Sequence, residues 1–245
     1  MTLAATDLTV TKGDNTILGP LEFAVEPGTI TAICGPNGAG KSTLLTMLAG
    51  LAEPSSGTVT LDEGPIATLH PRERARAIGY LPQDGEVAWD VSVRSLAALG
   101  RYPHGDEALE PVESALGVLD LKRLSDRPIS TLSGGERARA LLARVLAGTP
   151  QWILADEPLA ALDLAHQLAL LEVLRRQARS GTGIVLIVHD LAIAMNHADR
   201  VVVLSQGTIS ADGRPETALA PEVIAQVWRV EASWQGKEGA KALSY

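Results

Sequence analysis

Five short stretches of this chain carry side chains that could do chemistry on a nucleoside phosphate: residues 35–43, Gln83, residues 132–136, residues 156–157 and His189. The first stretch fits the phosphate-binding pattern G-x-x-x-x-G-K-[ST] and consists of Gly35, Pro36, Asn37, Gly38, Ala39, Gly40, Lys41, Ser42 and Thr43. Its glycines let backbone N–H groups approach phosphate oxygens, and a helix that starts there adds the positive end of its dipole. The pattern predicts that a phosphate is held, but not what is done with it.

Two side chains of this loop have predicted roles of their own. Lys41 would place a positive charge between the β- and γ-phosphates, and the Ser42 hydroxyl would ligate Mg²⁺. A chance match in a glycine-rich turn is the alternative. The apolar strand expected at 30–34 and the helix expected at 41–51 favour the phosphate loop. Cys34, in that strand, is expected to be a small buried residue and not a reactive thiol.

Asp156 and Glu157 end an apolar strand, which is where ligands bind in open α/β sheets. Asp156 is predicted to hold Mg²⁺ directly or through water. Glu157 could reach a water in line with the γ-phosphate and act as a general base. His189 also ends an apolar strand, and Gln83 follows Tyr80-Leu-Pro. Singly, each could be a solvated or structural residue. The order of all of them together is hard to obtain by accident.

Composition places these motifs in an ordinary globular chain. The 245 residues, 46% of them apolar, suit one large α/β domain or one domain with an embedded subdomain. The net charge of −8 implies no basic face for nucleic acid, and the single cysteine allows no internal disulfide, which favours a reducing compartment. The longest apolar run, near 184–188, is far below the ~20 residues that span a bilayer, and residues 1–7 do not resemble a signal peptide.

The elements that must position the motifs can be predicted coarsely. Short strands and turns are expected over 1–30, with turns at 12–15 and at Pro27-Gly28. Residues 91–149 are mostly helical in pattern, and leucines 164, 168, 171 and 174 recur at helical spacing. Buried strands are expected at 30–34, 152–155, 183–188 and 200–204. Alternating strands and helices predict a mainly parallel sheet, with the helical stretch as an inserted subdomain.

The motifs in this order resemble the ATP-binding cassette (ABC) ATPases over essentially the whole chain. Residues 35–43 are similar to the Walker A loop of that family, Gln83 to its Q-loop and Leu132-Ser-Gly-Gly-Glu136 to its signature motif. Residues 152–158 resemble Walker B with the catalytic glutamate, residues 161–163 the D-loop and His189 the switch histidine. Kinases and small GTPases, the rival phosphate-loop classes, do not carry such a signature.

The resemblance implies a fold and a division of the chain. The fold class is α/β, with a P-loop (RecA-like), mainly parallel sheet core, an N-terminal antiparallel β subdomain and an inserted α-helical subdomain. The whole chain, 1–245, would form a single nucleotide-binding domain. The core and β subdomain would take residues 1–88 and 149–235, and the helical subdomain residues 89–148.

The resemblance also implies ATP and Mg²⁺ as cofactors and a role for each site residue. Glu157 would polarise the attacking water, His189 would hold the γ-phosphate and the water, and Ser42, Gln83 and Asp156 would hold the metal. In this family the signature binds the ATP of a second copy, so two chains would pack head to tail around two ATP molecules. The residues that would serve this contact are Ser133, Gly134, Gly135 and, in communication across the dimer, Asp163.

Two positions depart from the pattern of the family. Glu136 stands where glutamine is commoner, and we expect it to point away from the phosphate, with little effect. The turn that usually carries an aromatic ring against adenine reads Val10-Thr-Lys12-Gly13. The Lys12 stem can cover the base, but stacking worth ~1–3 kcal/mol is lost. Weak discrimination between ATP and GTP is therefore predicted.

A second layer of resemblance points to the importer ATPases for iron-siderophore, haem and vitamin B12. It rests on residues 74–83, on Val93, on Leu99-Gly100-Arg101-Tyr102-Pro103-His104 and on residues 212–215, 221–224 and 227–231. A plain helix-ending loop is the alternative for 100–104. In such importers a permease helix would dock near 84–90, where Trp89 is expected to be exposed. The implied partners are a second copy, two transmembrane permease subunits and, indirectly, an external substrate-binding protein, but no nucleic acid. The implied location is peripheral, at the cytoplasmic face of the inner membrane.

Other functions fit these residues less well. A DNA-maintenance ATPase of the SMC or Rad50 type would need a long coiled coil, for which residues 44–151 leave no room. A regulator that binds ATP without turnover is disfavoured by Glu157 and His189. Another kind of ABC importer, or a soluble ABC ATPase outside transport, stays open. An exporter also stays possible, although exporters more often fuse this domain to membrane helices.

Overall fold

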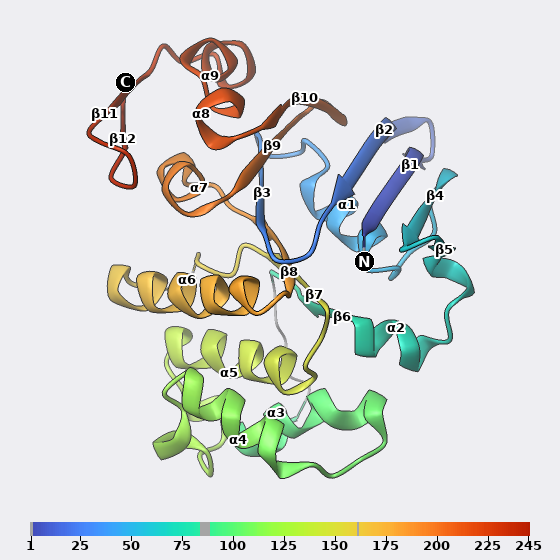
Figure 1. Ribbon diagram of the computed structural model, residues 1–245, viewed down its shortest axis with the longest axis vertical. Helices are drawn as coiled ribbons and strands as arrows, with labels where there is room; N and C mark the ends of the chain where they lie inside the picture. The colour runs from blue at the N-terminus through green and yellow to red at the C-terminus, as the bar shows by residue number, and fades with distance from the viewer. Residues whose placement is uncertain (1, 84–88, 161) are drawn as a thin grey trace.

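The computed structural model describes residues 2–83, 89–160 and 162–245. This part has two large sheets, with helices between and beside them, and a small two-stranded sheet (Figure 1). The larger sheet has six strands in the order β10-β9-β3-β8-β7-β6. All neighbours are parallel except β9 and β10, which pair antiparallel. Its strands are β3 (Ile30–Cys34), β6 (Ile78–Leu81), β7 (Trp152–Asp156), β8 (Gly183–Ile187), β9 (Arg200–Ser205) and β10 (Thr208–Gly213). The predicted α/β fold with a mainly parallel sheet is confirmed.

Helices and the second sheet cover both faces of this sheet, which is why its strands are apolar at nearly every position. In β8 the side chains alternate between two cores. Ile184 and Leu186 pack with the helical layer, whereas Val185 and Ile187 pack with α1 and the second sheet. Cys34 is fully buried in the first of these cores, and its burial raises the pKa of the thiol to about 12.

The second sheet is antiparallel, with the strand order β2-β1-β4-β5. Its strands are β1 (Leu3–Lys12), β2 (Asn15–Val25), β4 (Ser56–Leu61) and β5 (Gly64–Pro65). Lys12 pairs with Asn15 across the predicted hairpin turn. The expectation of short strands over 1–30 was wrong, because β1 and β2 have 10 and 11 residues. Their alternating buried positions pack on the core that also contains α1, so pairing continues along the whole hairpin.

Helix α1 (Lys41–Leu48) begins at the phosphate loop and shares one core with both sheets. It ends three residues before the predicted end at Leu51. Gly50 has φ +65°, a left-handed backbone that ends helices, and Leu51 beyond it is 57% exposed.

The helical layer lies on the other side of the six-stranded sheet and contains α3 (Val93–Ala98), the 3-10 helix η2 (Leu99–His104), α4 (Leu109–Val118), α5 (Gly134–Ala147) and α6 (Leu164–Arg179). The predicted apolar side of α6 is only half buried. Leu171 and Leu174 belong to the core, but Leu164 and Leu168 are 71% and 49% exposed. Leu164 shares a helix face with Leu171, so its exposure comes from its place in the first turn and not from its direction.

The remaining helices flank the two edges of the large sheet (Figure 1). Helix α2 (Pro71–Ala77) precedes β6. Helices α8 (Pro215–Ala218) and α9 (Pro221–Trp228) lie near β9 and β10, and α7 (Leu191–His197) contacts β3 and α8. The chain closes with a small hairpin of β11 (Ser233–Gln235) and β12 (Ala242–Ser244). The boundary predicted between residues 88 and 89 adjoins residues 84–88, which are outside the described part, and it stays a prediction.

Candidate functional site

The strand order brings four of the five motifs to one edge of the sheet. Gln83, Asp156-Glu157, His189 and the phosphate loop follow the carboxyl ends of β6, β7, β8 and β3, which are adjacent. A cavity of 660 Å³ opens there, lined by Ile17, Asn37, Gly38, Ala39, Gly40, Lys41, Ser42, Thr43, Gln83, Glu157 and His189. This edge is the usual ligand site of a parallel sheet.

The phosphate loop is closed by its own lysine. Lys41 Nζ donates hydrogen bonds to the carbonyl oxygens of Gly35 at 2.8 Å and Pro36 at 3.0 Å, and the residue is only 6% exposed. Burial lowers the pKa of the Lys41 amine, while the nearby Glu157 carboxylate raises it. Gly35 cannot carry a side chain, because a Cβ there would lie 2.1 Å from the carbonyl oxygen of Leu204. The loop thus presents a buried cation and bare backbone to the cavity.

Asp156 is the residue best suited to a metal. It is 4% exposed, and its Oδ1 has no hydrogen-bond partner among the described residues. Burial raises the pKa of the Asp156 carboxyl, and a hydrogen bond with the Ser42 side chain lowers it. A buried, unpartnered carboxylate oxygen calls for a ligand. Carboxylate and hydroxyl oxygens together suit Mg²⁺, so the donor set fits that ion.

Glu157 lies at the centre of the predicted catalytic residues. Gln83 Nε2 donates to Glu157 Oε2 at 2.9 Å, and the His189 imidazole Nε2 donates to Glu157 Oε1. Both carboxylate oxygens of Glu157 are therefore engaged by neighbouring side chains. Glu157 also has φ +51°, a left-handed backbone that costs a non-glycine residue ~1–2 kcal/mol. Such strain is often found at functional sites.

The signature residues lie away from this cavity. Ser133, Gly134 and Gly135 begin α5, and none of them lines the cavity of their own chain. The Ser133 Oγ accepts from the Glu136 N–H at 3.3 Å, and the Ser133 N–H donates to Glu136 Oε2 at 2.8 Å. Glu136 thus turns back onto the signature backbone. The S-x-x-E pattern of this capping box is a sequence signal that the expectations above did not use.

Asp163 also lies outside the cavity and caps the start of α6. Its Oδ1 accepts from the His166 N–H at 2.9 Å and contacts the His166 Nδ1 at 2.7 Å. These hydrogen bonds lower the pKa of the Asp163 carboxyl. Residue 161 of the predicted D-loop is outside the described part. The signature and the D-loop carry polar groups that the nucleotide pocket of the same chain does not use.

Ile17 lines the cavity although sequence reasoning did not single it out, and Lys12 does not line it. Ile17 is in β2, two residues beyond the hairpin turn. An apolar residue that close to the phosphate loop in space has no local signal in the sequence, since the two segments meet only through sheet packing. The placement of Lys12 against a base stays a prediction.

The segment 100–104 forms part of η2 and packs on the end of α5. Arg101 is 8% exposed, pairs with Asp106 at 2.6 Å and donates to the carbonyl oxygen of Ala147 at 3.2 Å. Gly100 lies so close to α5 that a Cβ would be 2.1 Å from the Arg144 carbonyl oxygen. The segment is therefore a built contact between helices and more than a plain helix-ending loop.

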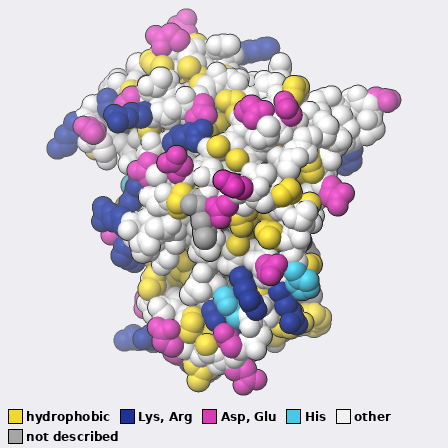
Figure 2. Space-filling model, turned by 45° about the vertical axis from the view of Figure 1, so that its right-hand side comes forward, with side chains coloured by type: hydrophobic (Ala, Val, Ile, Leu, Met, Phe, Trp, Pro, Cys, Tyr) yellow, Lys and Arg dark blue, Asp and Glu magenta, His cyan; other side chains and the backbone are white. Residues whose placement is uncertain are grey.

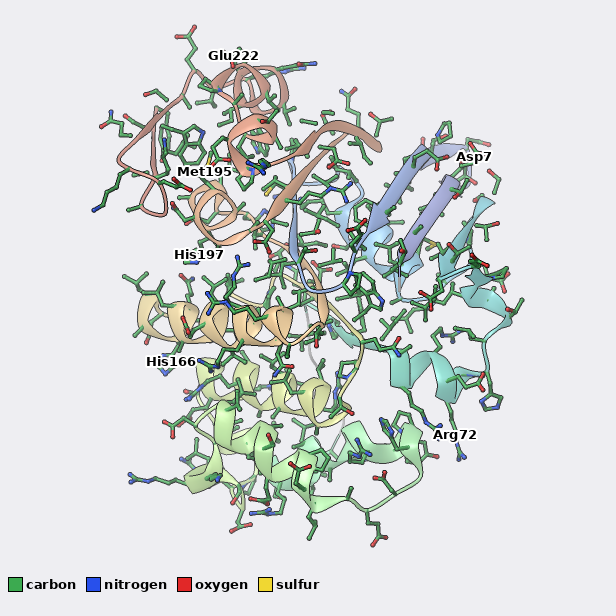
Figure 3. The ribbon with its side chains drawn as sticks, in the orientation of Figure 1. Asp7, Arg72, His166, Met195, His197 and Glu222 are labelled. Carbon is green, nitrogen blue, oxygen red and sulfur yellow. The ribbon has the colours of Figure 1, made fainter. Side chains whose placement is uncertain are left out.

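The surface over this region is mixed in charge and partly apolar. Figure 2 shows acidic and basic side chains interspersed over one face, with arginine, lysine and histidine side chains gathered in its lower part. Trp89 is 76% exposed, as predicted, and Tyr102 is 73% exposed. Figure 3 shows Arg72 projecting from α2 toward the helical layer, and its guanidinium lies 6.0 Å from the centre of the Tyr102 ring.

In the described part of the chain, every helix is too short or too polar to cross a membrane.

Comparison with known proteins decides the family. The sequence pattern of the ABC transporter family matches residues 18–160. The chain belongs to the ABC transporter family. A "Hemin import ATP-binding protein HmuV" of Myxococcus xanthus is 39% identical over 254 residues, covering 98% of this chain and 95% of that protein. The protein of the same name from Rhodococcus jostii is 40% identical, covering 93% of this chain and 80% of that one.

Solved structures agree with this assignment. A metal-chelate type ABC transporter in an inward-facing conformation superposes with a TM-score of 0.83 at 26% identity, covering 99% of this chain and 95% of that one. An ATP-binding subunit of an ABC transporter superposes with a TM-score of 0.81 at 26% identity, covering 95% of each chain. The predicted resemblance is confirmed, and this ABC transporter subunit is an ATPase that binds ATP.

Proposed function

We propose that this ABC ATPase drives the uptake of a metal chelate of the haem, iron-siderophore or cobalamin class. The observation that carries the ATPase chemistry is the hydrogen-bonded group of Gln83, Glu157 and His189 beside the phosphate loop. The cargo class is supported by the relatives named for hemin import and by the metal-chelate type transporter of similar fold.

ATP binding would begin with an exchange of hydrogen bonds in the phosphate loop. The phosphate oxygens would accept hydrogen bonds from the backbone N–H groups of residues 38–43. Lys41 Nζ would then leave the carbonyl oxygens of Gly35 and Pro36 and bind the β- and γ-phosphates. Ser42, Gln83 and Asp156 would hold Mg²⁺, which supplies charge neutralisation to the phosphates when bound. The unpartnered Asp156 oxygen and its Ser42 neighbour support this assignment.

Hydrolysis then requires a free carboxylate on Glu157. A γ-phosphate beside His189 competes for the imidazole N–H, which releases Glu157 Oε1 to accept a proton from water. The water oxygen bonds to the γ-phosphorus as the bond to the ADP oxygen breaks, so that ADP and phosphate leave. The imidazole holds the γ-phosphate and the water in line during this step. Placing water, base and phosphate together is most of what catalysis of phosphoryl transfer needs.

A second copy of the chain would complete each site. The N–H groups of Gly134 and Gly135 at the start of α5, with the Ser133 hydroxyl beside them, would form an anion site that the cavity of the same chain does not reach. Head-to-tail packing would bring them to the γ-phosphate bound by the other copy. Asp163, at the start of α6, would carry the contact between the two sites.

The membrane partners would be two permease subunits, with an external substrate-binding protein delivering the cargo. Trp89, Tyr102 and Leu99, with Leu99 at 51% exposure, are exposed apolar side chains that a permease helix could cover. The remaining residues of the predicted docking segment, 84–88, are outside the described part. Docking there would hold the chain at the cytoplasmic face of the inner membrane, and Gln83 would pass motion between this surface and the metal.

Two experiments test the proposal in turn. Glu157→Gln should bind MgATP, fail to turn it over and accumulate as a dimer in sedimentation, because closure without hydrolysis is trapped. Glu172→Gln, a carboxylate with 64% side-chain exposure on α6, is the matched control and should behave as wild type. A Glu157→Gln variant that stays monomeric at saturating MgATP refutes dimerisation of the isolated chain.

The transport role is tested by capturing the tagged chain from solubilised membranes of its native host. Recovery of a polytopic permease together with the chain would support an importer. The cargo class is supported if the ATPase activity of the recovered complex in proteoliposomes rises with a haem-, siderophore- or cobalamin-loaded binding protein. Recovery of an active enzyme without any membrane protein overturns the importer.

A further inference from the structure

The C-terminal hairpin of β11 and β12 lies outside the motifs that explain ATP hydrolysis, yet it is firmly attached. Trp234 pairs with Leu243 across the hairpin, packs against the helical core and donates its indole N–H to the Leu219 carbonyl oxygen at 2.7 Å. Gly236 begins the turn with φ +92°, where a Cβ would lie 2.3 Å from the carbonyl oxygen of Ala240. The hairpin therefore has one specified geometry.

The hairpin is joined to α7 by a reciprocal pair of hydrogen bonds. Asn196 Nδ2 donates to the Lys241 carbonyl oxygen at 2.8 Å, and the Lys241 N–H donates to Asn196 Oδ1 at 2.8 Å. The same amide nitrogen also donates to the Ala192 carbonyl oxygen within α7 at 2.8 Å. One side chain thus bonds its own helix and both backbone groups of residue 241, while the Lys241 side chain takes no part in the pair.

Helix α7 begins immediately after His189. Asp190 caps it, because its Oδ1 accepts from the Ala192 N–H at 2.7 Å and the Ile193 N–H at 3.3 Å. His189 is therefore joined to the start of α7 through Asp190, and to the sheet through Val188, whose N–H donates to the Ile33 carbonyl oxygen at 3.2 Å. On its inner side α7 rests on the core through Ala194 and Met195, of which Met195 is labelled in Figure 3. The hairpin holds the other side.

We propose that Asn196 and the C-terminal hairpin position the His189 imidazole. Held between core and hairpin, α7 keeps one axial position, which fixes the reach of the imidazole to Glu157 and to the γ-phosphate. This inference rests on the proposed role of His189 in hydrolysis. Asn196 is a positioning residue, since it acts through α7 and contacts no reacting atom.

The expected effect is on turnover and not on ATP binding. Displacing a catalytic group by about 1 Å can cost ~10²-fold in rate. Because Arg175 still binds the carbonyl oxygen of His197, next to Asn196 at the same end of α7, only a partial displacement is expected when the hairpin contact is lost. Asn196→Ala should lower kcat for ATP about tenfold and leave KM for ATP unchanged.

The experiment compares four variants in the complete transporter and in the purified chain. Asn196→Ala and a chain shortened to residue 235 should lower kcat alike, and Asn196→Asp, which keeps only the acceptor for the Lys241 N–H, should fall between them and wild type. Lys241→Ala is the control, because it keeps both backbone groups, and it should match wild type. In NMR spectra of the purified chain, the His189 Cε1–H signal, identified by its absence in His189→Gln, should shift in the first three variants only.

The outcomes separate this inference from the proposed function. Full ATPase activity in His189→Ala refutes the role of His189 itself. Suppose that His189→Ala loses activity, while Asn196→Ala and the shortened chain keep the wild-type kcat and an unmoved His189 signal. That result overturns positioning by the hairpin and leaves the role of His189 intact. A raised KM with unchanged kcat also overturns it. So does an effect of Lys241→Ala equal to that of Asn196→Ala, because the pair would then not depend on the backbone of residue 241.

Discussion

Replacing Gly135 by alanine separates the phosphate site of the signature from the fold of the chain. Gly135 is the second residue of α5 and has no left-handed backbone to strain. Among the described residues, a Cβ at this position would meet only the Leu162 Cδ2 atom within 4 Å, at 3.4 Å, which is an ordinary van der Waals contact. Alanine in a helix is up to ~1 kcal/mol more favourable than glycine. Gly135→Ala should therefore raise the free energy of unfolding slightly, by about 0–1 kcal/mol.

The same methyl group should strongly lower the rate of ATP hydrolysis. In the proposed dimer it lies where the N–H groups of α5 meet the γ-phosphate of the other copy. The methyl group would keep the γ-phosphate away from these N–H groups, and loss of one such hydrogen bond at a developing charge costs ~3 kcal/mol, or about 10²-fold in rate. ATP binding to the phosphate loop of the same chain should not change, because Gly135 does not line that cavity.

Three measurements on Gly135→Ala test this reasoning: urea unfolding, binding of a fluorescent ATP analogue, and steady-state phosphate release. Gly64→Ala in β5 is the control, since in the described part of the chain a Cβ there would meet only the Leu61 carbonyl oxygen, at 3.8 Å. Wild-type phosphate release by Gly135→Ala would refute the signature as a phosphate site. A destabilisation beyond ~2 kcal/mol would instead refute the claim that the chain itself tolerates the methyl group.

Three further predictions concern single side chains. Lys12→Tyr should tighten ATP binding about tenfold by restoring stacking on the base, and an unchanged Kd in titration calorimetry would contradict the placement of Lys12. Cys34 should resist iodoacetamide at pH 8 in the folded chain, because burial raises the pKa of its thiol to about 12; rapid alkylation seen by mass spectrometry would contradict that burial. Arg101→Ala should lower the free energy of unfolding by about 2 kcal/mol, since a buried donor to the Ala147 carbonyl oxygen is lost. The Arg101 guanidinium also lowers the pKa of Asp106 from 3.8 to about 2. The stabilisation of the folded chain by this ion pair is therefore present above pH 4 and is lost as the pH falls toward 2. Urea midpoints of Arg101→Ala measured from pH 5 to 2 should lack that decline, and an identical decline in the variant would count against the ion pair.

Local sequence patterns are enough to predict much of the site. The phosphate loop needs a strand, glycines and a helix in immediate succession, and β3 and α1 follow in that order. Asp156 and His189 are predicted to end strands because each follows an apolar run, and β7 and β8 end at Asp156 and Ile187. The start of α5 at Ser133 can also be predicted from neighbouring residues, because Ser133 and Glu136 form the S-x-x-E capping pattern. Chemistry of this kind depends on neighbours in sequence, so the sequence alone can specify it.

Long-range packing hides other features from sequence reasoning. Ile17 reaches the nucleotide cavity because the antiparallel sheet packs over α1, and Arg101 is buried because η2 meets the end of α5. The exposure of Leu164 is not predicted because helical spacing gives the direction of a side chain but not what covers it. Asn196 gives no signal, since its partner Lys241 is 45 residues away.

By itself the sequence determined that the chain carries the phosphate-loop pattern, which residues are expected to contact the phosphates, and that strands and helices alternate around them. Only the tertiary structure decided that β6, β7, β8 and β3 are neighbours, so that Gln83 and His189 meet on the two oxygens of Glu157. It also decided that the signature lies away from its own cavity. The physical reason is that strand order follows from burying both faces of one sheet at once, a condition on the whole chain that no single segment carries.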